Sequence, residues 1–368
     1  MPVRSLSFIY SPGRIRRLDA VRRGDSPSEF FYGALELEKR GLNVRFIEAD
    51  PMTPPHWPCA ALNFMGQHGP IKLDGHVTQA VWNAFSQWKD SDVVVGTTGA
   101  HALALALLSV MRCHSVPVVG IQCGLLNHPI DWGRRNSTAA LMRRMENMLF
   151  GEGEFQPMLT AYPGIGDHLH VNQFGVDVEF WKPGAASERG YVLAVGNDGR
   201  RDYEVLMAAA RQMEVAFVVV TEKNRLRNPP ANVRHVAGTY GSGLSDVELR
   251  DLVRGAACVV TPLQSTRQPS GQSVTLQAMA CGRPVILSDT EGLWCRKTLR
   301  DRETLLLTPV GDAGVLAERI REVLSDGSLA RGLGDAAREA VCCQATIEQF
   351  ADRLFSRCQL AVERERKT

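Results

Sequence analysis

Short β-rich runs alternate with helical stretches along nearly the whole chain, and this alternation limits the fold more than any other feature of the sequence. Parallel strands need crossover connections long enough to hold a helix, so the pattern predicts parallel sheets with helices on both faces. In the first half, we predict strands at residues 5–10, 43–48, 93–95 and 118–121, and helices at residues 28–40 and 100–111.

The same alternation begins again after a turn-rich stretch at residues 164–188. There we predict strands at 191–195, 216–220, 233–236, 258–261 and 284–288, with helices at 203–212, 246–254 and 274–281. The sequence therefore predicts two Rossmann-like domains, residues 1–178 and 179–345. A C-terminal helix within residues 346–368 is expected to pack back toward the first domain.

Net charge and cysteine content indicate which partners and which cellular compartment to expect. Lys+Arg 42 against Asp+Glu 40 leaves a net charge of +2, which argues against nucleic acid as a partner. The nine cysteines show no C-x-x-C spacing and lie mostly in apolar segments, as expected in the reducing cytoplasm. The longest apolar stretch, residues 102–111, is about half a membrane span. We expect a cytoplasmic protein that does not cross a bilayer.

Two segments suggest peripheral contact with an anionic membrane. The first is an arginine cluster made of Arg14, Arg16, Arg17, Arg22 and Arg23. The second is a predicted amphipathic helix at residues 138–150 that carries Met142, Met145, Met148 and Leu149. A solvated charged face and a helix packed on its sheet explain the same residues, and the sequence leaves both readings open.

A turn of small polar residues precedes the predicted helix at residues 274–281. Its members are Ser270, Gly271, Gln272 and Ser273. Small residues at a helix start expose backbone N–H groups at the positive end of the helix dipole, where a diphosphate is stabilised. Simple helix capping is the alternative for such a turn taken alone.

The complete run at residues 270–286 resembles the signature of family 4 retaining glycosyltransferases, a Gly-rich turn followed by Ala-Met-Ala-x-Gly-x-Pro-Val. Residues 175–183, 195–202 and 243–262 are similar to further family segments in the same order. The resemblance implies an α/β GT-B fold, in which two Rossmann-like domains face each other across a central cleft. It also implies a nucleotide-diphosphate sugar donor held mainly by the C-terminal half.

The resemblance assigns candidate site residues. The candidate donor-binding residues are Gly13, Arg14, Gly196, Asn197, Tyr240, Ser270, Gly271, Gln272, Ser273 and Gln277. The candidate catalytic residues are Arg200, Arg201, Lys223 and His101, of which the cationic ones would neutralise the leaving diphosphate. Gln122 and Cys123 are assigned to the acceptor side. We expect no metal and no cofactor besides the donor substrate.

The chain departs from the family pattern at several of these positions. The two glutamates that members commonly carry fall at Pro269 and Gln277, and the catalytic-loop histidine falls at Cys123. The arginine and lysine of the diphosphate loop fall at Asn197 and Asp202. Gln277 can still form a hydrogen bond with a ribose diol, without charge.

The expected activity is transfer of a sugar, with retention of configuration, from a donor such as a UDP-sugar to a hydroxyl acceptor. A membrane lipid or a cell-envelope glycan would serve as acceptor. By resemblance, the β-phosphate takes the acceptor proton, so no protein base is needed. Two alternatives remain open: a nucleotide-sugar epimerase of GT-B fold, and a catalytically inactive nucleotide-sugar-binding protein.

Overall fold

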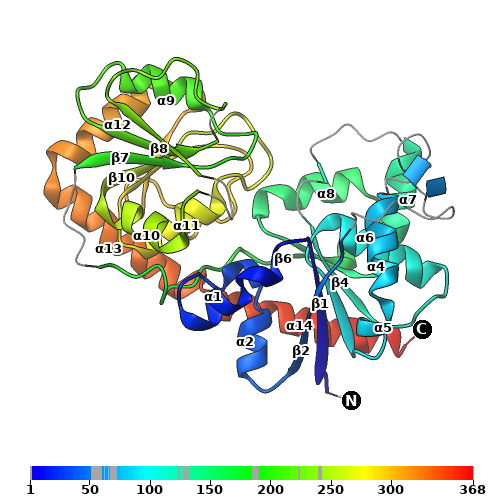
Figure 1. Cartoon of the computed structure of the whole chain (residues 1–368). Helices are drawn as coiled ribbons and strands as arrows, with labels where there is room; N and C mark the ends of the chain where they lie inside the picture. The colour runs from blue at the N-terminus through cyan, green and yellow to red at the C-terminus, as the bar shows by residue number, and fades with distance from the viewer. Residues whose placement is uncertain are drawn as a thin grey trace. The chain divides into compact units, whose positions relative to one another are not determined.

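The computed structural model describes residues 2–50, 60–61, 63–64, 66, 73–122, 125–126, 132–184, 190–222, 224–238 and 243–367. The chain divides into two compact units (Figure 1). The first unit contains Met1–Asp19, Phe30–Gln173 and Glu348–Thr368, and the second contains Ala20–Glu29 and Phe174–Ile347. The main division thus lies at 173/174, whereas the sequence placed it at 178/179. A short segment of the N-terminal half, Ala20–Glu29, belongs to the second unit.

The first unit is built on a parallel sheet of six strands in the order β2-β1-β3-β4-β5-β6. The strands are β1 (Ser5–Tyr10), β2 (Asn43–Glu48), β3 (Val93–Gly96), β4 (Val118–Gln122), β5 (Glu146–Leu149) and β6 (Leu169–Val171). Every residue of β3, β4 and β5 is buried, as expected for central strands of a sheet covered on both faces.

Two of the longer helices of the first unit begin at side-chain caps. The helices are η1 (Ile15–Arg17), η2 (Glu29–Phe31), α2 (Ala34–Lys39), α4 (Gly75–Asn83), α5 (Phe85–Trp88), α6 (Gly99–Val110), α7 (Trp132–Met142), η3 (Glu152–Glu154), α8 (Phe155–Ala161), η4 (Gly166–His168) and α14 (Ile347–Glu365), while α1 (Leu18–Arg23) continues into the second unit. Asp74 caps α4 and Thr98 caps α6 through their side-chain oxygens. Both helices contribute to the main apolar core of this unit.

Two predicted helices are wrong. The helix expected at residues 28–40 is interrupted because Tyr32 and Gly33 have positive φ angles of 53° and 80°. A side chain at Gly33 would lie 2.9 Å from the backbone of Ala351 in α14, so the close packing of this helix requires the glycine. The helix expected at 138–150 is instead the end of α7, a turn and the strand β5.

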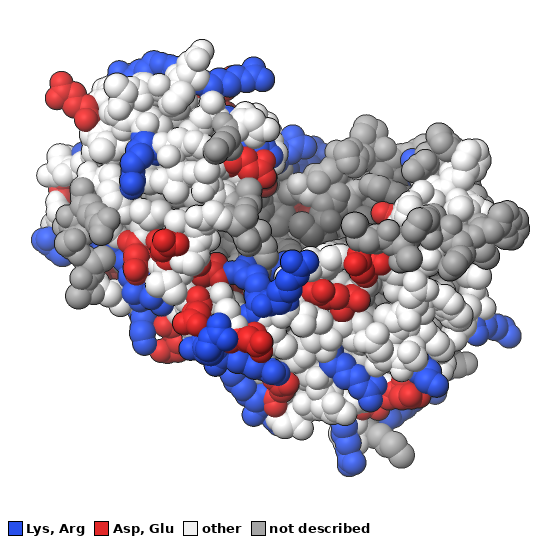
Figure 2. Space-filling model, viewed as in Figure 1, with Lys and Arg blue, Asp and Glu red and all other residues white. Residues whose placement is uncertain are grey.

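The strand β5 also changes the membrane interpretation. Met142, Met145, Met148 and Leu149 are each at most 3% exposed. These side chains fill the core of the first unit or line its sheet and form no apolar surface on a helix. No described helix is long and apolar enough to cross a membrane. Basic and acidic side chains are interspersed on the face shown in Figure 2, without a broad area of one sign.

The second unit repeats the architecture with the strand order β12-β11-β10-β7-β8-β9, again all parallel. Its strands are β7 (Tyr191–Val195), β8 (Phe217–Thr221), β9 (Val233–Ala237), β10 (Ala256–Thr261), β11 (Val285–Ser288) and β12 (Leu306–Thr308). Its further helices are α9 (Tyr203–Ala210), α10 (Asp246–Gly255), α11 (Gln272–Ala280), α12 (Ala313–Ser325) and α13 (Gly327–Gln344). Figure 1 shows α9 and α12 on one face of this sheet and α10 and α11 on the other.

Candidate functional site

The amide side chain of Asn197 forms several of the hydrogen bonds that hold the loop after β7. Asn197 donates from Nδ2 to the carbonyl oxygen of Gly238 at 2.9 Å. Its Oδ1 accepts from the backbone N–H of Glu222 at 2.8 Å and from the hydroxyl of Thr221 at 2.9 Å. Asn197 therefore joins the loops at the carboxyl ends of three neighbouring strands, which is the edge where ligands of open α/β sheets bind.

Arg201 follows this loop and has a buried guanidinium group. The residue is 8% exposed. Its Nε lies 3.2 Å from Oδ2 of Asp198, whose side chain is 40% exposed. Neither Nε nor Nη1 has a hydrogen-bond partner, although both atoms are buried. Since buried donors normally find partners, this guanidinium is under-satisfied in the structure as it stands.

Two glycines give the guanidinium its space. A Cβ atom on Gly196 would lie 2.0 Å from Nε of Arg201, and one on Gly271 would lie 2.5 Å from Nη1. Any larger residue at either position would therefore displace the guanidinium. The structure thus brings together three residues that the sequence proposed for the site, from the β7 loop and from the segment that starts α11.

The helix α11 begins without a side-chain cap. Its N-cap residue is Gly271, which has a left-handed conformation with φ 76°. Because glycine has no side chain, it cannot accept a hydrogen bond from the N–H groups of the first turn. The other helices that start within the second unit after β7 are capped by side-chain oxygens of Asp202, Ser245, Asp312 and Asp326. Ser270 and Ser273 are half-buried, while Gln272 is buried.

Arg201 and the start of α11 place two positive features side by side. The N-terminus of a helix carries a partial positive charge, so a cation there is unfavourable. A guanidinium removed from water and only partly paired adds a further cost. An anion bound beside both groups would remove these costs, because it would accept from the unpaired donors and neutralise the charge. The arrangement is therefore chemically suited to a phosphate group.

Gln277, about one and a half turns into α11, contacts a buried carboxyl group. Its Nε2 donates to Oε1 of Glu29 at 2.9 Å. The same carboxyl group accepts from Nε1 of Trp181 at 2.8 Å and from the backbone N–H of Asp177 at 3.1 Å. Burial outweighs these hydrogen bonds and raises the pKa of Glu29 to about 7. Sequence reasoning did not single out Glu29, because an isolated acid at the start of a predicted helix carries no recognisable signal.

In the first unit, two candidates lie near the start of α6. His101 is 2% exposed, with Nδ1 3.0 Å from the hydroxyl oxygen of Thr98. Burial lowers the pKa of His101 to about 4, so the ring is neutral at pH 7. Gln122 is 1% exposed and donates to Asn147 at 2.9 Å. The Gln122 Oε1 atom is buried without a partner, and a Cβ on Gly99 would lie 2.9 Å from it.

The remaining candidates occupy loops. Gly13 has φ 85° with open space around it, and Arg14 places its guanidinium carbon 5.5 Å from the ring centre of Phe30. Arg200 is half-buried, and its backbone N–H donates to Oδ1 of Asp198 at 3.0 Å. Lys223, Tyr240 and Cys123 lie outside the described residues.

A polar groove of about 500 Å³ opens beside Arg201, and sequence reasoning did not identify it. Three further arginines line it, Arg211, Arg225 and Arg227. Arg225 donates from Nη2 to the carbonyl oxygen of Asn197 at 2.6 Å, which ties the wall of the groove to the β7 loop. Spacing alone could not reveal this groove, because its lining comes from α9 and from the segments after β8 and β10.

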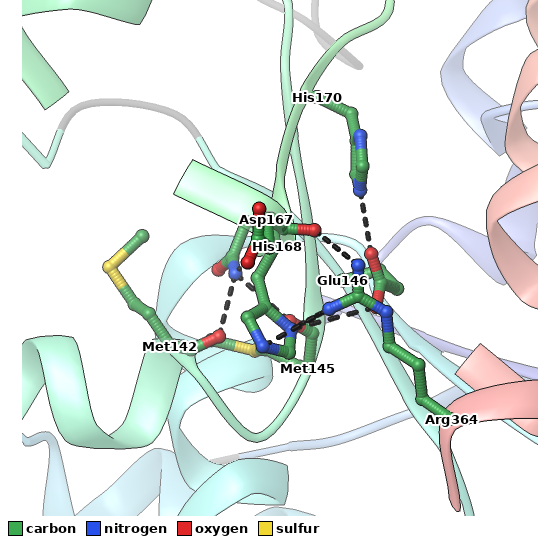
Figure 3. A network of polar contacts seen from close by, with 8 residues as sticks. Met142, Met145, Glu146, Asp167, His168, His170 and Arg364 are labelled. Carbon is green, nitrogen blue, oxygen red and sulfur yellow. Dashed lines mark hydrogen bonds and ion pairs between the residues drawn. The ribbon is translucent and has the colours of Figure 1, made fainter. Parts of the chain in front are cut away.

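Figure 3 shows a second cluster of titratable side chains, around Glu146, which is not a candidate site because Glu146 lies at the amino end of its strand. The Glu146 carboxylate accepts from His170 at 2.6 Å and lies 3.1 Å from Nε of Arg364 in α14. Burial raises the pKa of Glu146, but hydrogen bonds from His168 and His170 and the charge of Arg364 outweigh it and lower the pKa to about 2. Glu146 is the first residue of β5. The cluster therefore fastens α14 to the amino ends of the strands.

Comparison with protein families finds a match within the second half of the chain. Residues 190–326 match a family profile described as "Glycosyl transferases group 1". The chain is also similar to alpha-maltose-1-phosphate synthase of Mycobacterium tuberculosis, with 26% identity over 227 residues. That alignment covers 53% of this chain and 56% of the relative, so the chain spans about half the length of the curated relatives it matches.

Solved structures similar to this one span nearly the whole chain. Sucrose-phosphate synthase from Thermosynechococcus elongatus has a TM-score of 0.70 at 18% identity, covering 99% of this chain and 100% of that one. HepE of Anabaena, solved in complex with UDP-glucose, has a TM-score of 0.67 at 14% identity and covers 96% of this chain and 98% of that one. At such low identity these similarities concern the fold alone.

Proposed function

Because this chain has the GT-B fold and its residues 190–326 belong to the glycosyl transferases group 1 family, we propose that it is a glycosyltransferase using a nucleotide-diphosphate sugar. The second unit binds the donor, and a hydroxyl group is the acceptor. We further propose that the nucleotide is uridine diphosphate. The similarity to HepE, whose structure contains UDP-glucose, supports this choice of donor.

One observation carries the proposal: the buried, incompletely paired guanidinium of Arg201 lies against the uncapped start of α11. Breaking the bond between a sugar and a diphosphate builds negative charge on the leaving phosphate. Oriented N–H dipoles and a fixed cation stabilise that charge without reorganising during the reaction. Arg201 and the backbone N–H groups that follow Gly271 are therefore the proposed diphosphate site.

The proposed mechanism needs neither a metal ion nor a protein base. Arg201 and the helix dipole supply positive charge at the leaving group, which is the task that a divalent ion performs in other transferases. By the family resemblance, the β-phosphate takes the proton of the acceptor hydroxyl, and the configuration at the sugar carbon is retained. Arg200 and the arginines of the groove contribute to the positive potential around the diphosphate.

The acceptor is proposed only as a hydroxyl compound, with a membrane lipid or a cell-envelope glycan as candidate classes. The arginine cluster near the N-terminus gives weaker support to a lipid acceptor than its composition suggests. Within this cluster, Arg14 contacts Phe30 and Arg23 pairs with Asp25 at 3.0 Å. The apolar helix that would have accompanied it is the buried strand β5.

The proposal is tested by measuring release of uridine diphosphate from UDP-glucose in the presence of a mixture of hydroxyl acceptors. We expect turnover that is unchanged by a chelator such as EDTA. Arg201→Met should lower turnover by about 100- to 1,000-fold, as expected for loss of a charge-stabilising donor, and lower donor affinity by a smaller factor. Full turnover in Arg201→Met would remove the assigned role.

Two results would favour the alternative functions. Formation of an epimer of the donor sugar without any acceptor would indicate an epimerase. Binding of uridine diphosphate without turnover on any acceptor or donor would indicate a binding protein.

A further inference from the structure

The carboxyl group of Glu29 holds together three segments of the second unit. It is fully buried, and the segment to which it belongs, Ala20–Glu29, is the only described part of the chain before residue 174 that belongs to this unit. Its three donors come from the segment at 177–181 and from α11. The Glu29 carboxyl group stabilises this arrangement, because each of its three donors would be buried without a partner in its absence.

This contact fixes which end of the Gln277 amide points outward. Above its raised pKa Glu29 is a carboxylate, whose oxygens only accept hydrogen bonds, so the NH₂ end of Gln277 then faces Glu29, as the 2.9 Å contact shows. The amide oxygen then points away. No described group donates to this oxygen, and it is absent from the buried atoms that lack a partner, so it keeps some solvent contact although Gln277 as a whole is only 5% exposed. Gln277 thus presents an acceptor in a fixed orientation.

The fixed acceptor and the proposed diphosphate site lie on one helix. Gln277 follows Gln272, the first residue of α11, by five positions, which corresponds to about 8 Å along the axis. A ligand whose phosphates lie at the start of α11 therefore brings its next polar groups within reach of Gln277. In a nucleoside diphosphate, these groups are the hydroxyls of the ribose.

We propose that Glu29 is a positioning residue, which turns the amide oxygen of Gln277 outward to accept a hydrogen bond from a ribose hydroxyl of the donor nucleotide. The inference rests on the proposed function, because it concerns the same nucleotide. It also gives a chemical reason for glutamine at a position where the family commonly carries glutamate. Only an amide can donate to Glu29 and accept from the ribose at the same time.

The test compares uridine diphosphate with its 2′,3′-dideoxy analogue by calorimetry at pH 8.5, above the raised pKa of Glu29. The wild-type chain should bind the ribose form roughly five- to tenfold more tightly, the worth of one neutral hydrogen bond. In Glu29→Gln this ratio should fall to about twofold, because the new NH₂ group allows the Gln277 oxygen to turn inward. Binding of inorganic pyrophosphate should not change.

Trp181→Phe is the matched control. It removes one donor from Glu29 but leaves the bond between Glu29 and Gln277, so the ratio should stay at the wild-type value. An equal loss in Trp181→Phe and Glu29→Gln would mean general disturbance of the cluster and would overturn the inference. If Glu29→Gln does not fold, Gln277→Met decides, because its ratio must fall to about one.

Binding measurements on the wild-type chain distinguish failure of this inference from failure of the proposed function. Binding of uridine diphosphate with no preference for the ribose form would overturn the role of Gln277 and Glu29 while leaving the donor assignment intact. Absence of any binding of uridine diphosphate would overturn both.

Discussion

At the scale of single residues, the unusual feature of this protein is how charges are buried. Arg201 is buried with two nitrogens that form no hydrogen bond, although one of them lies 3.2 Å from Asp198, whereas the Glu29 carboxyl group is buried with three donors around it. The first arrangement leaves donors for a ligand, and the second orients a neighbouring side chain. The sequence identified Arg201 because a family loop contains it. Glu29 could not be found in this way, since its partners lie far from it along the chain.

Replacing Gln277 with the glutamate that family members commonly carry should destabilise the folded protein. Gln277→Glu would place a second carboxyl group where the amide nitrogen now lies 2.9 Å from Glu29. Two carboxylates this close cannot both be ionised, and the pKa of Glu29 is already raised to about 7. The folded state then binds more protons than the unfolded state, so stability falls as pH rises from about 5 to 8. Thermal melts should show a loss of about 3 kcal/mol at pH 8.

The exchange of both residues is the control for this prediction. In the double variant Glu29→Gln with Gln277→Glu, one amide again faces one carboxylate, and the pH-dependent loss should largely disappear. Equal melting of wild type and Gln277→Glu from pH 5 to 8 would show that the two side chains are not in contact in solution.

At the scale of helices and strands, the sequence predicted the second unit better than the first. The predicted strands and helices of this unit begin and end within a few residues of the observed ones, because caps and turns mark their ends clearly. In the first unit, apolar residues at 138–150 mimic a helical face but belong to α7 and β5. Burial on both faces makes a short central strand continuously apolar, so periodicity could not distinguish it from a helix.

The start of α11 gives a prediction at this scale. Gly271→Ala introduces a Cβ that would lie 2.5 Å from Nη1 of Arg201, at a backbone φ of 76°. Gly311→Ala is the matched control, since Gly311 has φ 81° and nothing within 4 Å. Each change costs roughly 1–2 kcal/mol of backbone strain. Calorimetry should show weakened binding of uridine diphosphate in Gly271→Ala alone. Equal binding in both variants would contradict the placement of Arg201 against this helix.

At the scale of the whole molecule, both units are parallel α/β sheets, and the comparisons confirm the predicted GT-B fold and the family resemblance for residues 190–326. The candidate chemistry of the second unit lies at the carboxyl ends of its strands. The cluster around Glu146 lies at the amino end of β5, where it ties the C-terminal helix α14 to the first unit. A cluster of titratable groups therefore indicates a catalytic site only when it lies at the carboxyl ends of the strands.

If Arg201 is retained for a diphosphate at some cost to the stability of the fold, thermal melting with and without uridine diphosphate will show both effects. At 100 times the wild-type Kd, the ligand should stabilise the wild-type chain by about 2.7 kcal/mol. Arg201→Met should melt at the same or a higher temperature without ligand, because it removes a buried, poorly paired charge.

The ligand-induced shift of Arg201→Met should fall to half or less, whereas Arg211→Met, which removes another arginine of the same groove, should keep most of it. An Arg201→Met variant that melts lower than wild type without ligand, yet keeps the full shift with uridine diphosphate, would mean that Arg201 stabilises the fold and does not bind the diphosphate.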